Sequence, residues 1–199
     1  MKTRIISLIL AVSLIITAGC GGVQNNAETY KYEGPFYSLS LRKSWHMFDF
    51  GGDDLKIQGY YRYVTFSKRP LSLKTTNEIN DLEYALTCAC VYDSSIKAGD
   101  FSSLIIPGEI PGVKVLKKDK FEVDGVTGRW LESEVQFEGN TNSAILVDIP
   151  IEKGYIQIDF FGPAADEELQ KEAREIIKSL EITNPDYFTE NQQDEPWRR

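Results

Sequence analysis

Four β-rich segments follow one another with very little chain between them, over residues 113–162. They read VKVLKKDKFEV, VTGRWLESEVQFE, SAILVDIPI and YIQIDFFG, and the turns between them are DG, GNTN and EKG. The pair Asp124–Gly125 is typical of a two-residue hairpin turn. Because such short connections join antiparallel neighbours, the sequence predicts an up-and-down sheet as the centre of the fold.

Three strands are also predicted nearer the start of the chain. In FYSLSLRKSW, residues 36–45, the alternation places Tyr37, Leu39 and Leu41 on one apolar face. HMFDF, residues 46–50, predicts a short strand that ends at the GGDD turn. LKIQGYYRYVTFSKRP, residues 55–70, predicts a long strand with aromatic residues on both faces. A strand that is apolar on both sides belongs to a sheet that is covered on both sides.

Two helices are predicted, one before the four-stranded segment and one after it. Thr75 and Glu78 have the spacing of a capping box, and apolar residues then recur at helical spacing as far as Ala89. Pro163 is expected near the first turn of the second helix, followed by acidic residues that suit the positive end of the helix dipole. The apolar stripe of this helix consists of Leu169, Ala173, Ile176, Ile177 and Leu180. The irregular connection after residue 93 has room for a further short helix near residues 98–104.

The start of the chain has the pattern of an export signal. Lys2 and Arg4 precede an apolar run over residues 5–17, which at about a dozen residues is too short to span a bilayer as a helix. LIITAGCGG, residues 14–22, resembles the lipobox of bacterial lipoproteins, in which small residues directly precede the cysteine. That resemblance implies cleavage before Cys20 and acylation of its sulfur. Since Gly21 follows instead of Asp, it also implies the outer membrane or the cell surface. An ordinary secretory signal with an incidental cysteine is the alternative.

Length and charge define the organisation of the rest of the chain. Residues 21–33 are polar and are expected to form a tether, residues 34–182 a single domain, and residues 183–199 a disordered polar tail.

Residues 1–19 hold two basic and no acidic side chains, so the remainder carries 20 basic and 30 acidic residues, a net charge of −10. This charge argues against nucleic acid and against a polybasic contact with anionic lipid headgroups.

The domain resembles PsbP-like domains at both of its ends. FYSLSLRKSW matches their opening strand and Trp, and GYIQIDFFGPAADEELQKEAREIIKSLEI matches their closing strand, turn and helix. The resemblance departs at Arg42, where a Pro is expected, and in the connection over residues 94–112. It implies an α+β fold, an α/β/α sandwich in which helices cover both faces of a central, mostly antiparallel sheet. Characterised relatives, an extrinsic photosystem subunit and a Ran-binding nuclear import factor, are binding modules and not enzymes.

No catalytic motif is recognisable in the sequence. His46 is the sole histidine and there is no G-x-S-x-G element, so a structural or surface histidine is expected. Cys88 and Cys90 lie in the first predicted helix, where residues two apart point in nearly opposite directions and therefore cannot bond to each other or share a metal. On that basis Cys90 is expected in the core and Cys88 on the other side of the helix. Neither a cofactor nor a metal is expected.

Two functions remain open. The first is a non-catalytic binding or assembly module, held on a membrane through Cys20, that presents its domain to an unidentified protein partner. Its candidate binding residues are Trp45, Tyr60, Arg62, Asp53 and Asp54. The alternative is a small-ligand receptor or a hydrolase-type enzyme with an acidic cleft. Its carboxylates would come from the turn over residues 49–54 or from Glu132 and Glu134.

Overall fold

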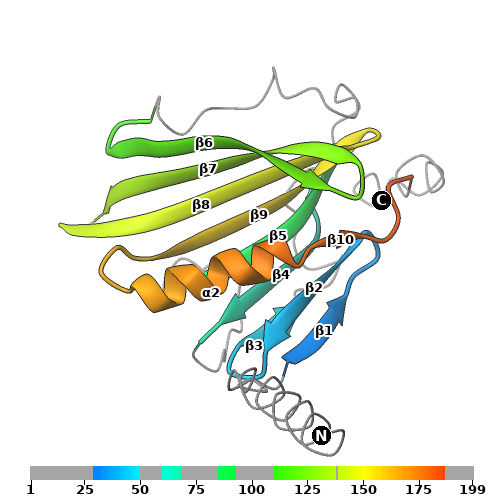
Figure 1. Cartoon of the computed structure of the whole chain (residues 1–199), viewed down its shortest axis with the longest axis horizontal. Helices are drawn as coiled ribbons and strands as arrows, with labels where there is room; N and C mark the ends of the chain where they lie inside the picture. The colour runs from blue at the N-terminus through cyan, green and yellow to red at the C-terminus, as the bar shows by residue number, and fades with distance from the viewer. Residues whose placement is uncertain (1–28, 50–59, 69–84, 93–109, 138, 187–199) are drawn as a thin grey trace, which may run out of the picture.

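Two antiparallel sheets and a helix make up the part of the chain that the computed structural model describes, residues 29–49, 60–68, 85–92, 110–137 and 139–186 (Figure 1). The smaller sheet has the strand order β1-β2-β10, and the larger has the order β3-β4-β5-β9-β8-β7-β6. The elements are β1 (Thr29–Glu33), β2 (Tyr37–Arg42), β3 (His46–Asp49), β4 (Tyr60–Ser67), β5 (Ala85–Tyr92), β6 (Val113–Val123), β7 (Val126–Phe137), β8 (Asn140–Ile151), β9 (Gly154–Pro163), α2 (Glu167–Lys178) and β10 (Glu181–Ile182).

The predicted up-and-down arrangement of the last four long strands is confirmed. Strands β6, β7, β8 and β9 are consecutive in the chain, and each pairs antiparallel with the next. Asp124 and Gly125, which join β6 to β7, have positive φ angles of 48° and 79°. A type I′ hairpin turn needs positive φ at both central residues, and Asp-Gly supplies that conformation at low cost.

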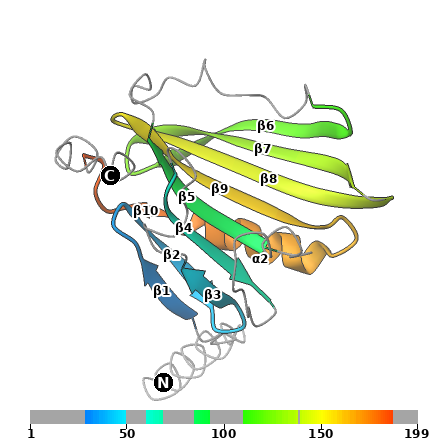
Figure 2. The same cartoon turned by 180° about the vertical axis from the view of Figure 1, so that it is seen from behind.

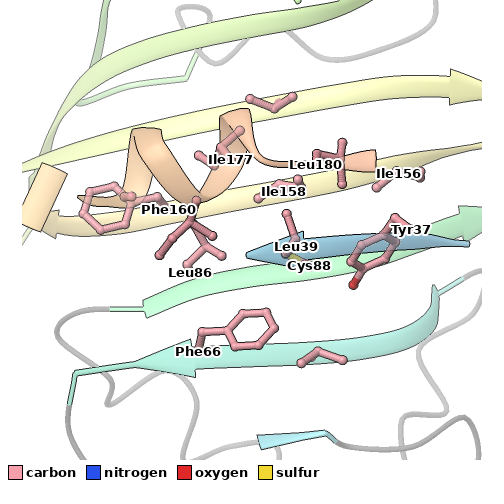
Figure 3. Packing of buried hydrophobic residues seen from close by; sticks show 14 of the residues in the cluster. Tyr37, Leu39, Phe66, Leu86, Cys88, Ile156, Ile158, Phe160, Ile177 and Leu180 are labelled. Carbon is pink, nitrogen blue, oxygen red and sulfur yellow. The ribbon is translucent and has the colours of Figure 1, made fainter. Parts of the chain in front are cut away.

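The core lies between one face of the large sheet and a layer formed by α2 and the small sheet. Figures 1 and 2 show this layer on a single side of the large sheet. We call that side of the sheet the helix face and the opposite side the far face. Figure 3 shows the core, where Leu86, Cys88, Ile158 and Phe160 of the helix face meet Leu39, Ile177 and Leu180. Burial of these apolar side chains, each worth about 1.5–3 kcal/mol, is the main force that holds the two layers together.

The helix predicted to continue to Ala89 is wrong at its C-terminal end. Leu86 and Ala89 lie in strand β5, which pairs with β4 on one side and β9 on the other. Six of the eight residues of β5 are buried, on both faces of the strand. A central strand buried in this way has a nearly continuous apolar sequence, which periodicity alone does not distinguish from a buried helix. Thr75, Glu78 and the proposed helix near residues 98–104 lie outside the described residues.

The expected α/β/α sandwich is also wrong. In the described part of the chain the second layer consists of one helix and a three-stranded sheet, and α2 covers only the helix face. The fold is therefore a mostly antiparallel β structure with two sheets. Thr29–Glu33 contributes to the second of these sheets as strand β1, although these residues were expected in the tether.

The closing helix begins later than Pro163, which is the last residue of β9. The Asp166 side chain accepts the Leu169 backbone N–H at 3.0 Å and so caps the helix, and Glu167 and Glu168 occupy the first turn. The predicted apolar stripe is confirmed, because all of its members are buried against the core: Leu169, Ala173, Ile176, Ile177 and Leu180.

Candidate functional site

The register of the large sheet brings polar side chains together on the far face. Arg129 of β7 pairs with Asp148 of β8, and Asp148 pairs with Gln157 of β9. Asp159 lies two residues beyond Gln157 and is therefore the diagonal neighbour of Asp148. Diagonal neighbours on adjacent strands are about 7–8 Å apart, within reach of each other's side chains. We call Asp148 and Asp159 the acidic pair.

Asp148 is buried and only half satisfied by its ionic partner. Arg129 directs both Nε, at 3.0 Å, and Nη2 to the same carboxylate oxygen, Oδ2. The other oxygen, Oδ1, is buried and accepts no hydrogen bond. The side chain of Asp148 is 1% exposed. Burial raises the pKa of Asp148, while the positive charge of Arg129 opposes that rise.

Asp159 has no such compensation. Within the described residues its carboxylate takes part in no hydrogen bond or ion pair, and the neighbouring Thr87 hydroxyl donates instead to the Asp159 backbone carbonyl at 3.4 Å. Burial and the negative charge of Asp148 raise the pKa of Asp159 to about 7. The side chain is half-buried, so it keeps some contact with solvent. The pair therefore joins a compensated carboxylate to an uncompensated one whose charge changes near neutral pH.

A further unsatisfied polar group lies on the same face. Thr65 of β4 pairs with Thr87 of β5, and Thr87 pairs with Asp159. The Thr65 hydroxyl is fully buried and has no hydrogen-bond partner. Buried polar groups in folded proteins are rarely left without partners. Two such groups, one on either side of Asp159, mark this part of the far face as the strongest candidate site in the described chain.

The chemistry of this site is that of hydrogen-bond acceptors. Asp148 Oδ1 and the Asp159 carboxylate both accept, and the charges of Asp148, Asp159 and Arg129 sum to −1 when all three are ionised. No group of three or more His, Cys, Asp or Glu side chains is placed to hold a metal ion in the described ranges. The arrangement therefore suits a donor that carries a single positive charge.

Trp45, a predicted binding residue, is part of the core. It is 2% exposed, and its indole Nε1 donates to Glu172 of α2 at 2.9 Å. Arg42 and Lys68 also contact the Glu172 carboxylate, and the Lys68 ammonium lies 5.4 Å from the Trp45 ring centroid. Burial alone would raise the pKa of Glu172, but the bonds from Lys68 and Trp45 hold it below its usual range. This network joins α2 to the strands beneath it, and it contains Arg42, the position at which the sequence departs from the PsbP-like pattern.

Of the other predicted binding residues, Tyr60 and Arg62 belong to strand β4. Asp53, Asp54 and Cys20 lie outside the described residues. His46 is exposed on β3, an edge strand of the large sheet. His46 therefore lies apart from the acidic pair, which belongs to β8 and β9.

Cys90 lies in the core as predicted, but the placement of Cys88 on the opposite side is wrong because it assumed a helix. Cys88 and Cys90 both lie on the helix face of β5, since side chains two residues apart in a strand point the same way. Both are free thiols in the core. Burial raises the pKa of each thiol well above its ordinary value, which keeps both protonated and unreactive.

Glu132 and Glu134, the other predicted carboxylates, lie on the helix face and are engaged in ion pairs. Arg174 Nη2 lies 2.7 Å from Glu132 Oε2, and Lys114 Nζ lies 3.4 Å from Glu134 Oε2. Sequence reasoning missed Asp148 and Asp159 instead. A signal was present, because both are acidic residues inside the otherwise apolar strand segments SAILVDIPI and YIQIDFFG. Charged residues are seldom buried unless they are paired or functional.

Comparison with solved structures identifies proteins that have a similar fold. No family model matches the chain, and no curated protein matches it. Among solved structures it is similar to cyanobacterial PsbP (CyanoP) from Synechocystis, with a TM-score of 0.53 and 15% identity over 82% of this chain and 96% of that one. The chain therefore has a PsbP-like fold.

Two further structures are less similar. LpqN, which is involved in cell envelope biogenesis of Mycobacterium tuberculosis, has a TM-score of 0.49 and 15% identity, over 80% of this chain and 92% of that one. A protein from Bacteroides thetaiotaomicron has a TM-score of 0.48 and 15% identity, over 77% of this chain and 48% of that one. In the described ranges, no helix has the length and apolar character needed to cross a membrane.

Proposed function

We propose that this protein is a membrane-anchored lipoprotein outside the cytoplasm, and that its PsbP-like domain is a non-catalytic binding module. The observation that carries the proposal is the segment LIITAGCGG, in which Cys20 directly follows two small residues. Two or three acyl chains on one cysteine hold a protein on a bilayer far more firmly than a single chain does. Strand β1 begins at Thr29, so the domain starts nine residues after the anchor.

The geometry of the far face supports binding over hydrolysis. Two carboxylates with different pKa values are also the equipment of a hydrolase that uses acid–base catalysis. However, the Asp148 side chain is 1% exposed and its Oδ2 is held by Arg129, so Asp148 is not free to act as a general acid or base. That leaves Asp159 as the accessible carboxylate, which is enough for recognition but not for a two-carboxylate mechanism.

The anchor is tested by metabolic labelling with a clickable palmitate in cells that make the full chain. We expect label in the wild-type protein and none in Cys20→Ala, together with a shift of the variant from the membrane fraction to the soluble fraction. A processed wild-type protein without label would refute the lipoprotein assignment. Release of the protein into the culture fluid after cleavage at another position would do the same.

The binding role is tested by pull-down from native membranes, with the anchored protein and Cys20→Ala compared at equal amounts. A partner retained by the anchored form and lost from the variant supports a module whose position matters. Turnover of a substrate that is abolished by Asp159→Asn would contradict the non-catalytic assignment and support the enzyme alternative.

A further inference from the structure

We propose that the acidic pair on the far face binds a primary alkylammonium group, and that Asp159 is its principal contact. This inference deepens the proposed function by naming the chemical class of the ligand. It rests on the arrangement of Asp148, Asp159, Arg129 and Thr65, and it is independent of how the chain is processed at its N-terminus.

The charges of the site favour a monovalent cation. Arg129 neutralises Asp148 through two N–H donors that meet at Oδ2, and the described residues offer no counter-charge to Asp159. Among the side chains that the structure describes, the nearest other cations on this face are Lys118 and Lys120 of β6, which pair with Leu131 and Arg129 of β7 and so lie more than one strand away from Asp159. One monovalent cation restores neutrality, whereas a phosphate or carboxylate would be repelled by the pair.

The site also offers hydrogen-bond acceptors that are not in use. A primary ammonium has three N–H donors and no acceptor. The Asp159 carboxylate supplies accepting oxygens that keep contact with solvent, and Asp148 Oδ1 is a buried acceptor with no hydrogen bond. The Thr65 hydroxyl, two strands away through Thr87, also lacks a partner. A divalent metal fits less well, because Ca²⁺ takes about 6–8 oxygen ligands and Mg²⁺ demands octahedral geometry.

An apolar side chain that is partly open to solvent lies beside the carboxylates. Leu146 lies directly opposite Asp159 in the register. Leu146 is half-buried, so part of its side chain remains open to solvent. A methylene chain laid against this surface would bury apolar area while its ammonium end meets Asp159, at about 25 cal/mol per Å² of apolar area removed from water. The ligand is thus an ammonium with an alkyl chain, either a free amine or a lysine side chain.

The experiment is calorimetric titration of the protein as purified from cells, in HEPES buffer at pH 8, which does not precipitate calcium. The probes are n-pentylammonium and the peptide Gly-Lys-Gly, with n-pentanol and CaCl₂ as the competing chemistries. We expect both amines to bind and the alcohol and calcium not to bind. Tighter binding of the amine identifies a small molecule as the source of the ammonium, and tighter binding of the peptide identifies a protein.

Variants link binding to the site. Asp159→Asn should weaken amine binding at least tenfold, while Glu152→Gln, which removes one negative charge from the exposed turn after β8, should leave it within twofold. Because protonation removes the charge of Asp159, the amines should also bind at least tenfold more weakly at pH 5.5 than at pH 8. The other charged groups that face Asp159 in the described chain are Asp148 and, beyond it, Arg129; β5 presents Ala85, Thr87, Ala89 and Val91.

The outcome that overturns the proposal is specific. The alternative is that Asp159 shares a proton with Asp148 Oδ1, so that the pair is complete without a ligand. In that case no amine binds, and the carboxyl carbon signal of Asp159 titrates in the wild-type protein unchanged by 10 mM amine. If the site binds amines, the same addition lowers the pKa of Asp159. Equal binding of pentanol, or binding of calcium alone, would also refute the ammonium assignment. Failure of the Cys20 labelling leaves every one of these readouts intact.

Discussion

At neutral pH the folded chain holds Asp159 in surroundings that disfavour its charge. Its pKa rises to about 7 because of burial and the charge of Asp148, whereas an unfolded Asp titrates near pH 3.9. Between these values the folded state binds more protons than the unfolded state. Stability contributed by this group is therefore present at low pH and is lost as the pH rises from about 4 to about 7.

Replacement of Asp159 by Asn should remove this pH dependence. The shift corresponds to at most about 4 kcal/mol, which is an upper bound because the side chain keeps some contact with solvent. We expect Asp159→Asn to be more stable than the wild type at pH 8 by a few kcal/mol or less, and nearly equal to it at pH 4. Urea unfolding across this range measures the difference. Glu152→Gln is the matched control, and a wild-type curve that is flat between pH 4 and 7 would contradict the assignment.

At the level of elements, local sequence patterns predicted the structure correctly where a segment carried a signature of a single kind of structure. The Asp124–Gly125 turn and the apolar stripe from Leu169 to Leu180 each had a distinct signature, and both predictions are confirmed. Strand β5 had no such signature. Its sequence, ALTCACVY, is largely apolar because β5 is a central strand that is buried on both faces, and that position is a property of the sheet and not of the segment.

The exposed edge strand β6 carries four lysines, Lys114, Lys117, Lys118 and Lys120, in a chain whose net charge is −8. The strand ends the large sheet within the described residues, and the Asp119 carboxylate accepts the Lys120 backbone N–H at 3.0 Å. Lysines on an edge strand, and backbone donors that are already occupied, both hinder pairing with another chain.

Removal of two of these lysines should therefore promote association. We expect Lys118→Thr combined with Lys120→Thr to form several-fold more dimer than the wild type at equal concentration, measured by sedimentation velocity. Lys171→Gln combined with Lys178→Gln makes the same change in net charge on the exposed side of α2 and should remain like the wild type. Equal association of both double variants would show that charge alone, and not the strand edge, controls it.

For the whole molecule, the site was harder to predict than the fold. The PsbP-like resemblance came from packing segments at the two ends of the domain, and solved structures confirm the fold through CyanoP at 15% identity. The candidate site instead depends on strand register. Asp148 and Asp159 are separated by a hairpin, and Arg129 and Thr65 come from other strands. A single sequence does not specify which face each of these side chains occupies until the pairing of every strand is known.

The same register orients the molecule relative to its proposed anchor. Thr29 pairs with Arg42, so the start of the domain lies beside the turn that joins β2 to β3. His46 pairs with Ser67 at the end of β4, and Gly154 pairs with Tyr92 at the end of β5, so the turn between β8 and β9 lies at the opposite end of these strands. Nine residue steps from Cys20 to Thr29 span at most about 30 Å. The end of the domain with Ser44 should therefore stay nearer the bilayer.

Fluorophores attached to single cysteines test this orientation in the lipidated protein on vesicles that contain nitroxide-labelled lipid. We expect stronger quenching at Ser44→Cys than at Glu152→Cys, because the eight residues of β4 alone separate the two ends by about 26 Å. Both positions are exposed, and the native Cys88 and Cys90 are buried, so labelling is selective. Soluble nitroxide serves as the control for intrinsic accessibility. Equal quenching by the lipid at both positions would mean that the tether does not orient the domain, and the far face would then have no defined distance from the membrane.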